Sequence, residues 1–436
     1  MSCEPGRSRL EYQYLLVLLL LCLTLGVAYA VVTPAFGGPD EDAHWDYVRL
    51  VWDTRGDPAL MASTPAPAKS VRGHAPTYYW MVASSLIVSS GQPEEVQIFF
   101  GRMVSLALLL GEVLLAYLTA RLLSPHDRFV RLAAPAIVAL LPGRLWMGSV
   151  ISNDNLAAFS SAALLYIAAR MILRGFSRGS MVALAVFLVV AVASKPTAWA
   201  VVAAVGLALA VVGCHRCWRT RRFPFWGFAL SAATLCAALV AGGLLARGQL
   251  ERYVPRLESM WVKLHAIPTP EPEPFAHQWK SFWLPLWVAD AMPPEPVYWL
   301  GAIVVLPAAV GLVLWLAGVN MGKPAEGQPT GGRKYACVAM LGLASIGVWT
   351  LSLLQHLSVV AGTASFSVTR DIWPPTHARY LFPALLPFAC FVALGLSRIA
   401  PRRSWPIGLA ILLALFLCLN GVALYSMITH TYFWSS

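Results

Sequence analysis

The feature that most constrains this chain is a succession of apolar stretches, each about as long as a transmembrane helix, that continues from one end to the other. A helix needs about 20 apolar residues to cross the hydrocarbon core of a bilayer. Hydrophobic residues make up 58% of the chain and its mean hydropathy is +0.65, which is more apolar sequence than the core of a soluble protein uses. The sequence therefore predicts an all-α membrane protein, a polytopic bundle of about 11 transmembrane helices that forms one domain over residues 1–436.

Basic clusters between the apolar stretches indicate how the chain is oriented. The net charge of +11 comes from 32 Lys and Arg against 21 Asp and Glu. The basic residues lie mostly in short loops, for example around Arg121, Arg219 and Arg402, and such an excess marks the cytoplasmic side of a membrane protein. We therefore expect a multi-pass protein of the cytoplasmic membrane with its N-terminus inside, and the positive charge implies no nucleic-acid partner.

Two long segments fall on the outer face in this topology. Residues 34–98 form the first outer loop, in which we expect interfacial helices, and residues 247–297 form a large Pro-rich outer loop. If the apolar stretch over residues 76–90 crossed the membrane, the basic loop that follows would lie outside, so we expect this stretch to dip into the membrane or lie flat on it. Early transmembrane helices are expected at residues 13–33, 99–122, 130–148 and 155–173, and a later one at 225–246.

An acidic run directly follows the first apolar stretch. Asp40, Glu41 and Asp42 are unusual beside a membrane in a chain with only 12% charged residues, because ionised groups near hydrocarbon are costly and are mostly kept for function. If residues 42–53 form a helix, its charged residues lie along one stripe and its aromatic and apolar residues cover the rest. The structural alternative is that the acids only cap this helix, since carboxylates at a helix N-terminus bind free N–H groups.

Ionisable residues outside the basic loops gather at the outer ends of the predicted spans. They are Asp40, Glu41, Asp42, His44, His74, Asp154, Lys195, Arg370, His377 and Arg379. A carboxylate can act as a general base on a hydroxyl or hold a divalent cation, and Lys or Arg can neutralise a lipid phosphate. Together these residue types favour an enzyme that transfers a group from a lipid phosphate carrier at the outer face.

Five short motifs follow one another in the order found in one family. They are Pro39-Asp40-Glu41, His74-Ala75-Pro76-Thr77-Tyr78-Tyr79-Trp80, Asn153-Asp154-Asn155, Lys195-Pro196-Thr197 and His377-Ala378-Arg379-Tyr380-Leu381-Phe382-Pro383. With these motifs the chain resembles the GT-C-type integral membrane glycosyltransferases over most of its length, above all the branch of protein O-mannosyltransferases and lipid A aminoarabinose transferases. The resemblance implies an inverting transfer of a sugar from a polyprenyl-phosphate donor to a hydroxyl of a glycan, lipid or protein acceptor, in cell-envelope glycan or glycoconjugate synthesis.

The residue types and this resemblance together give a predicted role for each candidate residue. The predicted set is Asp40 and Glu41 for catalysis, Lys195, Arg379 and Arg370 for the donor phosphate, and Asp154, His44 and His74 for orienting the acceptor or a cation. Some enzymes of this type use a metal ion and others do not. If Mg or Mn takes part here, Asp40 and Asp154 are its expected ligands.

Alternatives stand beside these roles. Asp154 could cap the helix that follows it, Lys195 could extend to the membrane surface, Arg379 could anchor an outer helix end, and His44 could be a surface histidine. For the whole protein, one alternative is a transporter or flippase of a lipid-linked sugar, which would place ionisable residues such as Glu112 in the middle of spans. Another is a non-catalytic membrane partner with the same fold.

Overall fold

The structure is a computed structural model that describes residues 5–65, 71–220, 279–284, 295–317, 332–362, 378–399 and 404–433. The regular elements in these residues are all helical. They are α1 (Pro5–Val32), α2 (Glu41–Asp53), α3 (Pro58–Ser63), α4 (Thr77–Ala83), α5 (Leu86–Ser89), α6 (Glu94–Leu123), α7 (Arg128–Leu140), α8 (Pro142–Met147), α9 (Asp154–Arg174), α10 (Arg178–Ser194), η1 (Pro196–Ala198), α11 (Trp199–Thr220), α15 (Glu295–Leu316), α16 (Gly332–Gly362), η5 (Ala378–Ala384), α17 (Leu385–Ile399) and α18 (Trp405–Phe433).

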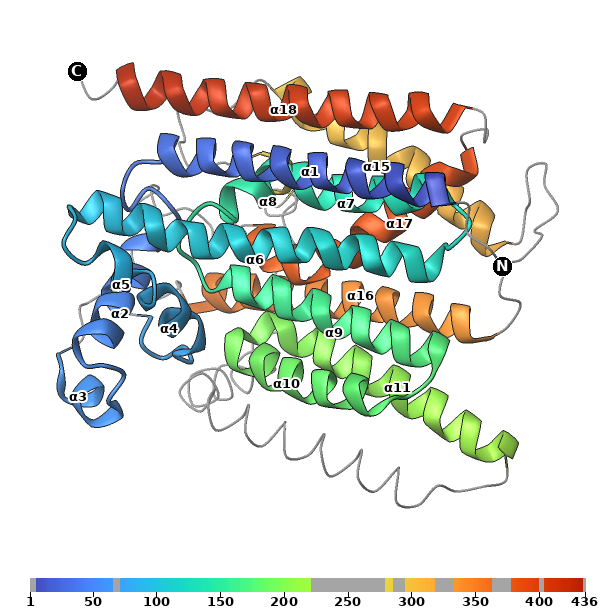
Figure 1. The fold of residues 1–436 in the computed structure, drawn as a ribbon, viewed down its shortest axis with the longest axis horizontal. Coiled ribbons are helices and arrows are strands. Elements are labelled where there is room, and N and C mark those ends of the chain that lie inside the picture. The colour runs from blue at the N-terminus through green and yellow to red at the C-terminus, as the bar shows by residue number, and fades with distance from the viewer. Residues whose placement is uncertain are drawn as a thin grey trace.

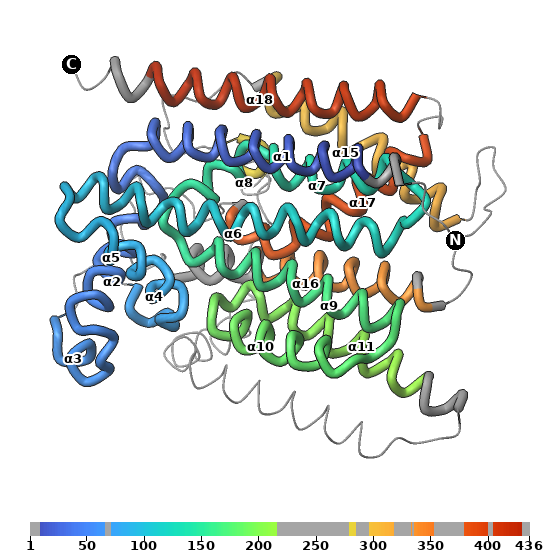
Figure 2. Tube along the Cα trace, in the orientation of Figure 1, coloured from blue at the N-terminus to red at the C-terminus, as the bar shows by residue number. Residues whose placement is uncertain are grey.

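The long helices run side by side as a bundle, and the short helices α2 to α5 gather at one end of it (Figure 1, Figure 2). Helix α6 packs against α7 and α9, α9 packs against α10, α11 packs against α16, and α15 packs against α17. Eight helices in the described part of the chain are long and apolar enough to cross a membrane. They cover residues 9–32, 94–123, 154–174, 196–215, 296–316, 335–352, 379–399 and 405–429.

The expected total of about 11 spans is therefore matched only in part. The span expected at 225–246 lies outside the described residues. Helix α10 is apolar but has only 17 residues. The expected single span at 130–148 is two helices, because Leu141 precedes Pro142 and takes an extended conformation, with φ −65° and ψ 113°. The ring of a proline disfavours helical geometry in the residue before it, so α7 ends there and α8 begins in a new direction.

A second proline break places a candidate residue. Lys195 precedes Pro196 and has φ −161° and ψ 147°, so it is extended between α10 and η1. This break lies at the end of the bundle that holds α4 and η5. There α10 contacts α4, and η1 contacts η5.

The first outer loop has its own small hydrophobic core. Trp45, Val48, Tyr78 and Tyr79 are buried in it, and it continues onto α6 and Ile151. The charged stripe predicted for residues 42–53 is exposed along α2, as expected. Helices α4 and α5, at seven and four residues, are each too short to cross a bilayer, in line with a stretch that dips into the membrane or lies on it.

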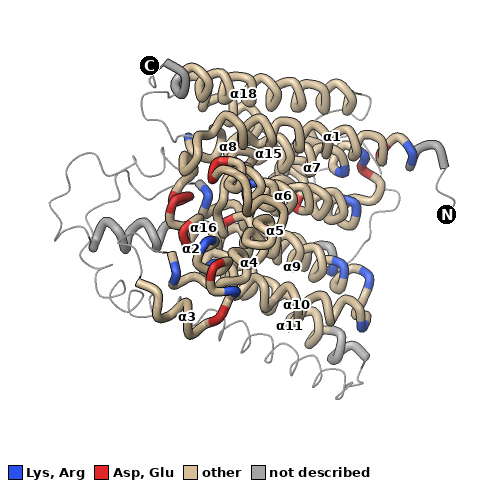
Figure 3. Tube along the Cα trace, turned by 60° about the vertical axis from the view of Figure 1, so that its left-hand side comes forward, with Lys and Arg blue, Asp and Glu red and all other residues tan. Residues whose placement is uncertain are grey.

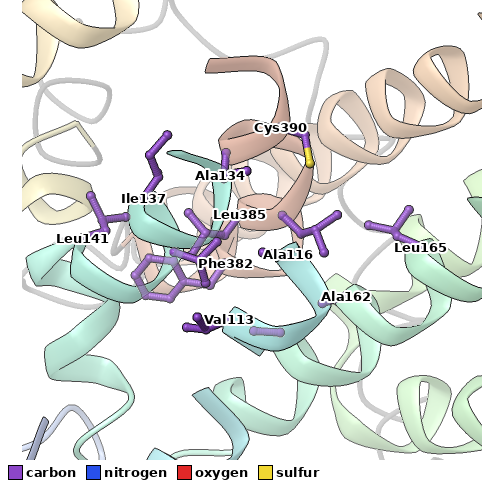
Figure 4. Packing of buried hydrophobic residues seen from close by; sticks show 14 of the residues in the cluster. Val113, Ala116, Ala134, Ile137, Leu141, Ala162, Leu165, Phe382, Leu385 and Cys390 are labelled. Carbon is purple, nitrogen blue, oxygen red and sulfur yellow. The ribbon is translucent and has the colours of Figure 1, made fainter. Parts of the chain in front are cut away.

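The main core joins α6, α7, α9 and α17 with η5. Figure 4 shows Phe382 and Leu385 packed against Val113 and Ile137 from α6 and α7. Phe382 is almost fully buried. Because η5 is fixed in the core by this ring, the residues that precede Phe382 are held at a defined place beside α9. Figure 3 shows Asp and Glu mostly at the end of the bundle that holds α2 to α4, and Lys and Arg where α9 ends and α10 begins.

Candidate active site

Asp40 stands outside the helix that it precedes. Its backbone has φ 57° and ψ 19°, a left-handed conformation that Asp tolerates better than most residues. Its side chain accepts no bond from the first turn of α2, so capping does not explain it. A Cβ added at Gly38 would lie 2.8 Å from Cβ of Val150, so the first outer loop packs directly against the segment that leads into α9.

Arg379 connects Asp40 to the distant C-terminal part of the chain. Its Nη2 donates to Oδ2 of Asp40 at 2.8 Å, and its Nη1 donates to the carbonyl of Pro39 at 3.3 Å. The Arg379 side chain is 9% exposed, whereas that of Asp40 is 37% exposed. A ligand can therefore reach Asp40, while the guanidinium is covered by protein.

A second ion pair joins the start of α9 to the break before η1. Lys195 Nζ donates to Oδ1 of Asp154 at 2.6 Å, and Ser152 Oγ donates to Oδ2 at 3.1 Å. Both ionised side chains are buried. Lys195 thus does not extend to the surface, and Asp154 pairs with a cation instead of serving mainly as a cap.

The two ion pairs meet in one place. Arg379 Nε lies 3.9 Å from Oδ2 of Asp154, and the ring of Tyr380 has Lys195 Nζ at 4.6 Å and the Arg379 guanidinium at 5.2 Å from its centroid. We call Asp40, Asp154, Lys195 and Arg379 the charge cluster; it holds two charges of each sign. Arg379 Nε is buried without a hydrogen-bond partner among the described residues. A buried donor left unsatisfied is unfavourable, so this N–H is well suited to an anionic ligand.

His44 is buried beside the charge cluster, which corrects the alternative of a surface histidine. Its Nδ1 is hydrogen-bonded to the hydroxyl of Tyr79 at 2.8 Å. Burial lowers the pKa of His44 to about 3, and the positive charges of Lys195 and Arg379 contribute. Burial also raises the pKa of Tyr79 far above its ordinary value. At neutral pH His44 and Tyr79 are therefore both uncharged, and they add no charge to the cluster.

Glu41 has surroundings quite different from those of Asp40. It is fully buried and forms an ion pair with Arg102 of α6 at 2.6 Å. The other N–H groups of Arg102 donate to the carbonyls of Ala30, Thr33 and Pro34, at 2.6 to 2.7 Å. Glu41 also accepts from the backbone N–H of Ile151 at 2.9 Å. The pair thus fastens the end of α1, the start of α2 and the segment before α9 to α6.

A second buried pair lies deeper in the bundle. Arg144 of α8 donates through Nε and Nη2 to Oε2 of Glu112, at 3.0 and 2.8 Å, and through Nη1 to Oδ1 of Asn155 at 2.7 Å. Its guanidinium also lies 5.4 Å from the ring centroid of Phe382. Glu112 is therefore a buried, hydrogen-bonded group, and Arg144 connects the start of α9 with η5, the two elements that carry Asp154 and Arg379.

The described residues do not offer a set of ligands suited to a resident metal ion. They contain no group of three or more His, Cys, Asp or Glu that could hold one. Asp40 and Asp154 each face a cation through one carboxylate oxygen, at 2.8 and 2.6 Å, and a metal ion would have to compete with these cations.

The structure brings four of the predicted residues together as the charge cluster, with His44 beside it. His74 lies next to α2, where its carbonyl accepts a bond from the Tyr47 hydroxyl at 3.2 Å. Arg370 and His377 lie outside the described residues, as does most of the predicted outer loop 247–297. Sequence reasoning assigned no role to Tyr380, Tyr79 or Arg102. Tyr380 and Tyr79 do lie within two of the motifs, but nothing local marks Arg102 as the partner of Glu41.

The fold of this chain is similar to those of solved membrane enzymes, although its sequence matches no described family. No family model matches the sequence, and no curated protein matches it. Among solved structures, the chain is similar to the oligosaccharyltransferase of Archaeoglobus fulgidus in the apo form, with a TM-score of 0.50 and 15% identity over 95% of this chain and 55% of that chain. It is also similar to ArnT from Cupriavidus metallidurans in the apo state, with a TM-score of 0.49 and 17% identity over 95% of this chain and 75% of that chain.

The fold of this chain is similar to that of the archaeal oligosaccharyltransferase. This similarity agrees with the resemblance predicted from the motifs at the level of the fold. The chain spans about 55% of the length of the archaeal oligosaccharyltransferase.

Proposed function

We propose that this protein is an inverting glycosyltransferase that moves a sugar from a polyprenyl-phosphate donor to an acceptor hydroxyl at the outer face of the cytoplasmic membrane, in the synthesis of cell-envelope glycans or glycoconjugates. The observation that carries the proposal is the charge cluster, in which a partly exposed Asp40 lies 2.8 Å from a buried Arg379. The shared fold of a sugar-transferring membrane enzyme supports it.

Asp40 is the general base in this proposal. Its carboxylate accepts the proton of the acceptor hydroxyl while the hydroxyl oxygen forms a bond to the anomeric carbon of the donor sugar. The bond between that carbon and the phosphate oxygen breaks, and the phosphate leaves with the electron pair. Attack from the face opposite the leaving group inverts the anomeric carbon. The left-handed backbone of Asp40 and its bond to Arg379 hold the carboxylate in one orientation.

Arg379 and Lys195 bind the donor phosphate and stabilise it as it leaves. Negative charge grows on the leaving phosphate in the transition state, so fixed cations in a covered site lower the barrier. The free Nε donor of Arg379 supplies one bond to a phosphate oxygen. Asp154 pairs with Lys195 at 2.6 Å, and the ring of Tyr380 lies beside both cations. In this assignment Glu41 positions the loop and takes no part in proton transfer.

The transporter alternative receives no comparable support. In the described spans the deeply buried charges include Glu112 and Arg144, and these two neutralise each other at 2.8 Å. A transport pathway would need ionisable groups that face a water-filled cavity at that depth.

The test is sugar transfer in proteoliposomes supplied with polyprenyl-phosphate sugars. We expect Asp40→Asn to lower the rate by about 10²- to 10⁴-fold, the usual contribution of a general base, with donor binding retained. Asp46→Asn, an exposed acid of α2 six residues after Asp40, is the matched control and should transfer at the wild-type rate. Full transfer by Asp40→Asn would remove this residue from the chemistry. Movement of the lipid-linked sugar across the membrane without transfer would favour a transporter.

A further inference from the structure

The C-terminal end of α2 has an unusual turn. The N–H of Gly56 donates to the carbonyl of Val51 at 2.9 Å and the N–H of Arg55 donates to that of Trp52 at 3.2 Å, which is the pattern of a Schellman motif. The left-handed position of this motif normally holds Gly, but here it is Arg55, with φ 53°. Gly56 follows with φ 73°. A left-handed backbone is unfavourable for a residue with a Cβ, and such strain is found most often at functional sites.

Arg55 lines an open hollow of about 600 Å³ between the end of α2 and α4. Trp52 and Asp53 from α2 and Trp80 from α4 also line this hollow. A Cβ at Gly56 would lie 3.0 Å from Nε1 of Trp80, so the turn lies close to the edge of this indole. The volume is within the range of ligand sites, roughly 300–1,000 Å³.

The lining of the hollow has both apolar faces and unused polar groups. Trp80 is 46% exposed and Trp52 is half-buried. Neither Asp53 nor Arg55 forms an ion pair or hydrogen bond with another side chain in the part of the chain that the structure describes. An indole offers a flat apolar face with negative π density and one N–H donor, a carboxylate accepts hydrogen bonds, and a guanidinium donates them.

A saccharide matches this combination. Its ring has an apolar face of C–H groups that packs on an indole, and its hydroxyls both donate and accept, so they can satisfy Arg55 and Asp53 together. A lipid chain would offer neither Asp53 nor Arg55 a hydrogen-bond partner, whereas a phosphate would pair with Arg55 but be repelled by Asp53.

We propose that this hollow is a remote subsite for a saccharide chain, and that the acceptor of the reaction is a glycan of several sugars. The inference rests on the proposed transferase function. Helix α2 has 13 residues, so at 1.5 Å per residue the hollow lies roughly 18 Å from Asp40. A single sugar at Asp40 cannot reach it, whereas an extended chain of sugars can occupy both places.

The test measures binding apart from transfer. The full-length protein in nanodiscs is titrated with linear hexasaccharides of glucose, mannose, galactose and arabinose, and with the four monosaccharides, by saturation-transfer NMR. We expect at least one hexasaccharide to bind, and Trp80→Ala and Asp53→Asn to weaken it about tenfold, the effect of one lost aromatic or polar contact. Met81→Ala, an exposed neighbour on α4, is the matched control and should bind within about twofold of wild type.

The outcomes separate this inference from the proposed reaction. Asp40→Asn should bind the hexasaccharide as wild type does, because binding at the hollow needs no proton transfer. If no hexasaccharide binds, if Trp80→Ala binds as wild type does, or if nanodisc lipid alone occupies Trp80, the subsite is refuted even where transfer is observed. If binding depends on Trp80 but no sugar is transferred, the subsite stands and the proposed reaction fails.

Discussion

Replacing Glu41 by Gln is expected to destabilise the protein strongly, although its neighbour Asp40 can be replaced by Asn with little effect on folding. Glu41 is fully buried and accepts four hydrogen bonds, from Nε and Nη2 of Arg102 and from the backbone N–H groups of Gly38 and Ile151. Gln has the same shape but only one acceptor oxygen. Its NH₂ group would face two of these donors, and Arg102 would stay charged and buried without a counterion.

The size of the effect follows from this burial. Breaking a buried ion pair by removing one partner lowers the free energy of unfolding by about 3–5 kcal/mol. The Asp40 side chain is 37% exposed, and in Asp40→Asn the Arg379 guanidinium keeps Asp154 at 3.9 Å. For that variant we expect a loss of only about 0–1 kcal/mol. Two adjacent acids should therefore differ by several kcal/mol.

The assay is reversible unfolding of the purified protein by SDS in mixed micelles, which gives the free energy of unfolding of each variant. The double variant Glu41→Leu/Arg102→Met should lose less than the two single variants together, because it leaves no buried charge unpaired. The exposed Asp46→Asn is the control for loss of a charge on α2. If Glu41→Gln unfolds at the wild-type SDS concentration but has lost sugar transfer, Glu41 acts in the chemistry and the positioning role is refuted.

Three further predictions concern the surroundings of the charge cluster. The pKa of His44 is about 3 in the folded protein and about 6.5 in an unfolded chain, so the unfolded state binds more protons between these values. The free energy of unfolding should therefore fall by up to about 1.4 kcal/mol per pH unit as the pH drops through this window. A His44→Gln variant should show a flatter pH dependence in the SDS titration, and an unchanged slope would contradict the assignment. Lys195→Met should weaken donor binding by about 10- to 100-fold, the contribution of one charge-assisted hydrogen bond to affinity. Lys195→Arg should restore part of the affinity. If Lys195→Met binds the donor as tightly as wild type, Lys195 has no role in phosphate binding. Dialysis against EDTA should leave the rate of sugar transfer unchanged, because two carboxylates that already face cations are a poor metal site. Loss of transfer that is reversed only by added Mg²⁺ or Mn²⁺ would show that the reaction needs a metal ion.

Much of the architecture could be predicted because local physical rules determine it. The long apolar stretches predicted spans where the structure has long apolar helices, and the charge pattern of residues 42–53 correctly predicted which face of α2 is exposed. Proline stereochemistry also acts locally, but its effect at Pro142 was missed, since apolar length alone cannot show that a span is divided. The candidate residues Asp40, Asp154, Lys195 and Arg379 were all found from motifs, and their roles stay predictions.

The helical membrane fold, the exposed face of α2 and the candidate acids and cations follow from the order of residues along the chain. This is because hydrophobic burial, helix periodicity and the cost of charge near hydrocarbon depend on residues close in sequence. How those residues pair depends on the packing of distant helices. Asp40 and Arg379 are 339 positions apart, and Glu41 and Arg102 are 61 apart. No local pattern distinguishes Asp40, which is partly open to a ligand, from Glu41, which is fully buried. That difference arises because α2 begins at this point, so that two adjacent side chains leave the backbone in different directions and meet different parts of the bundle.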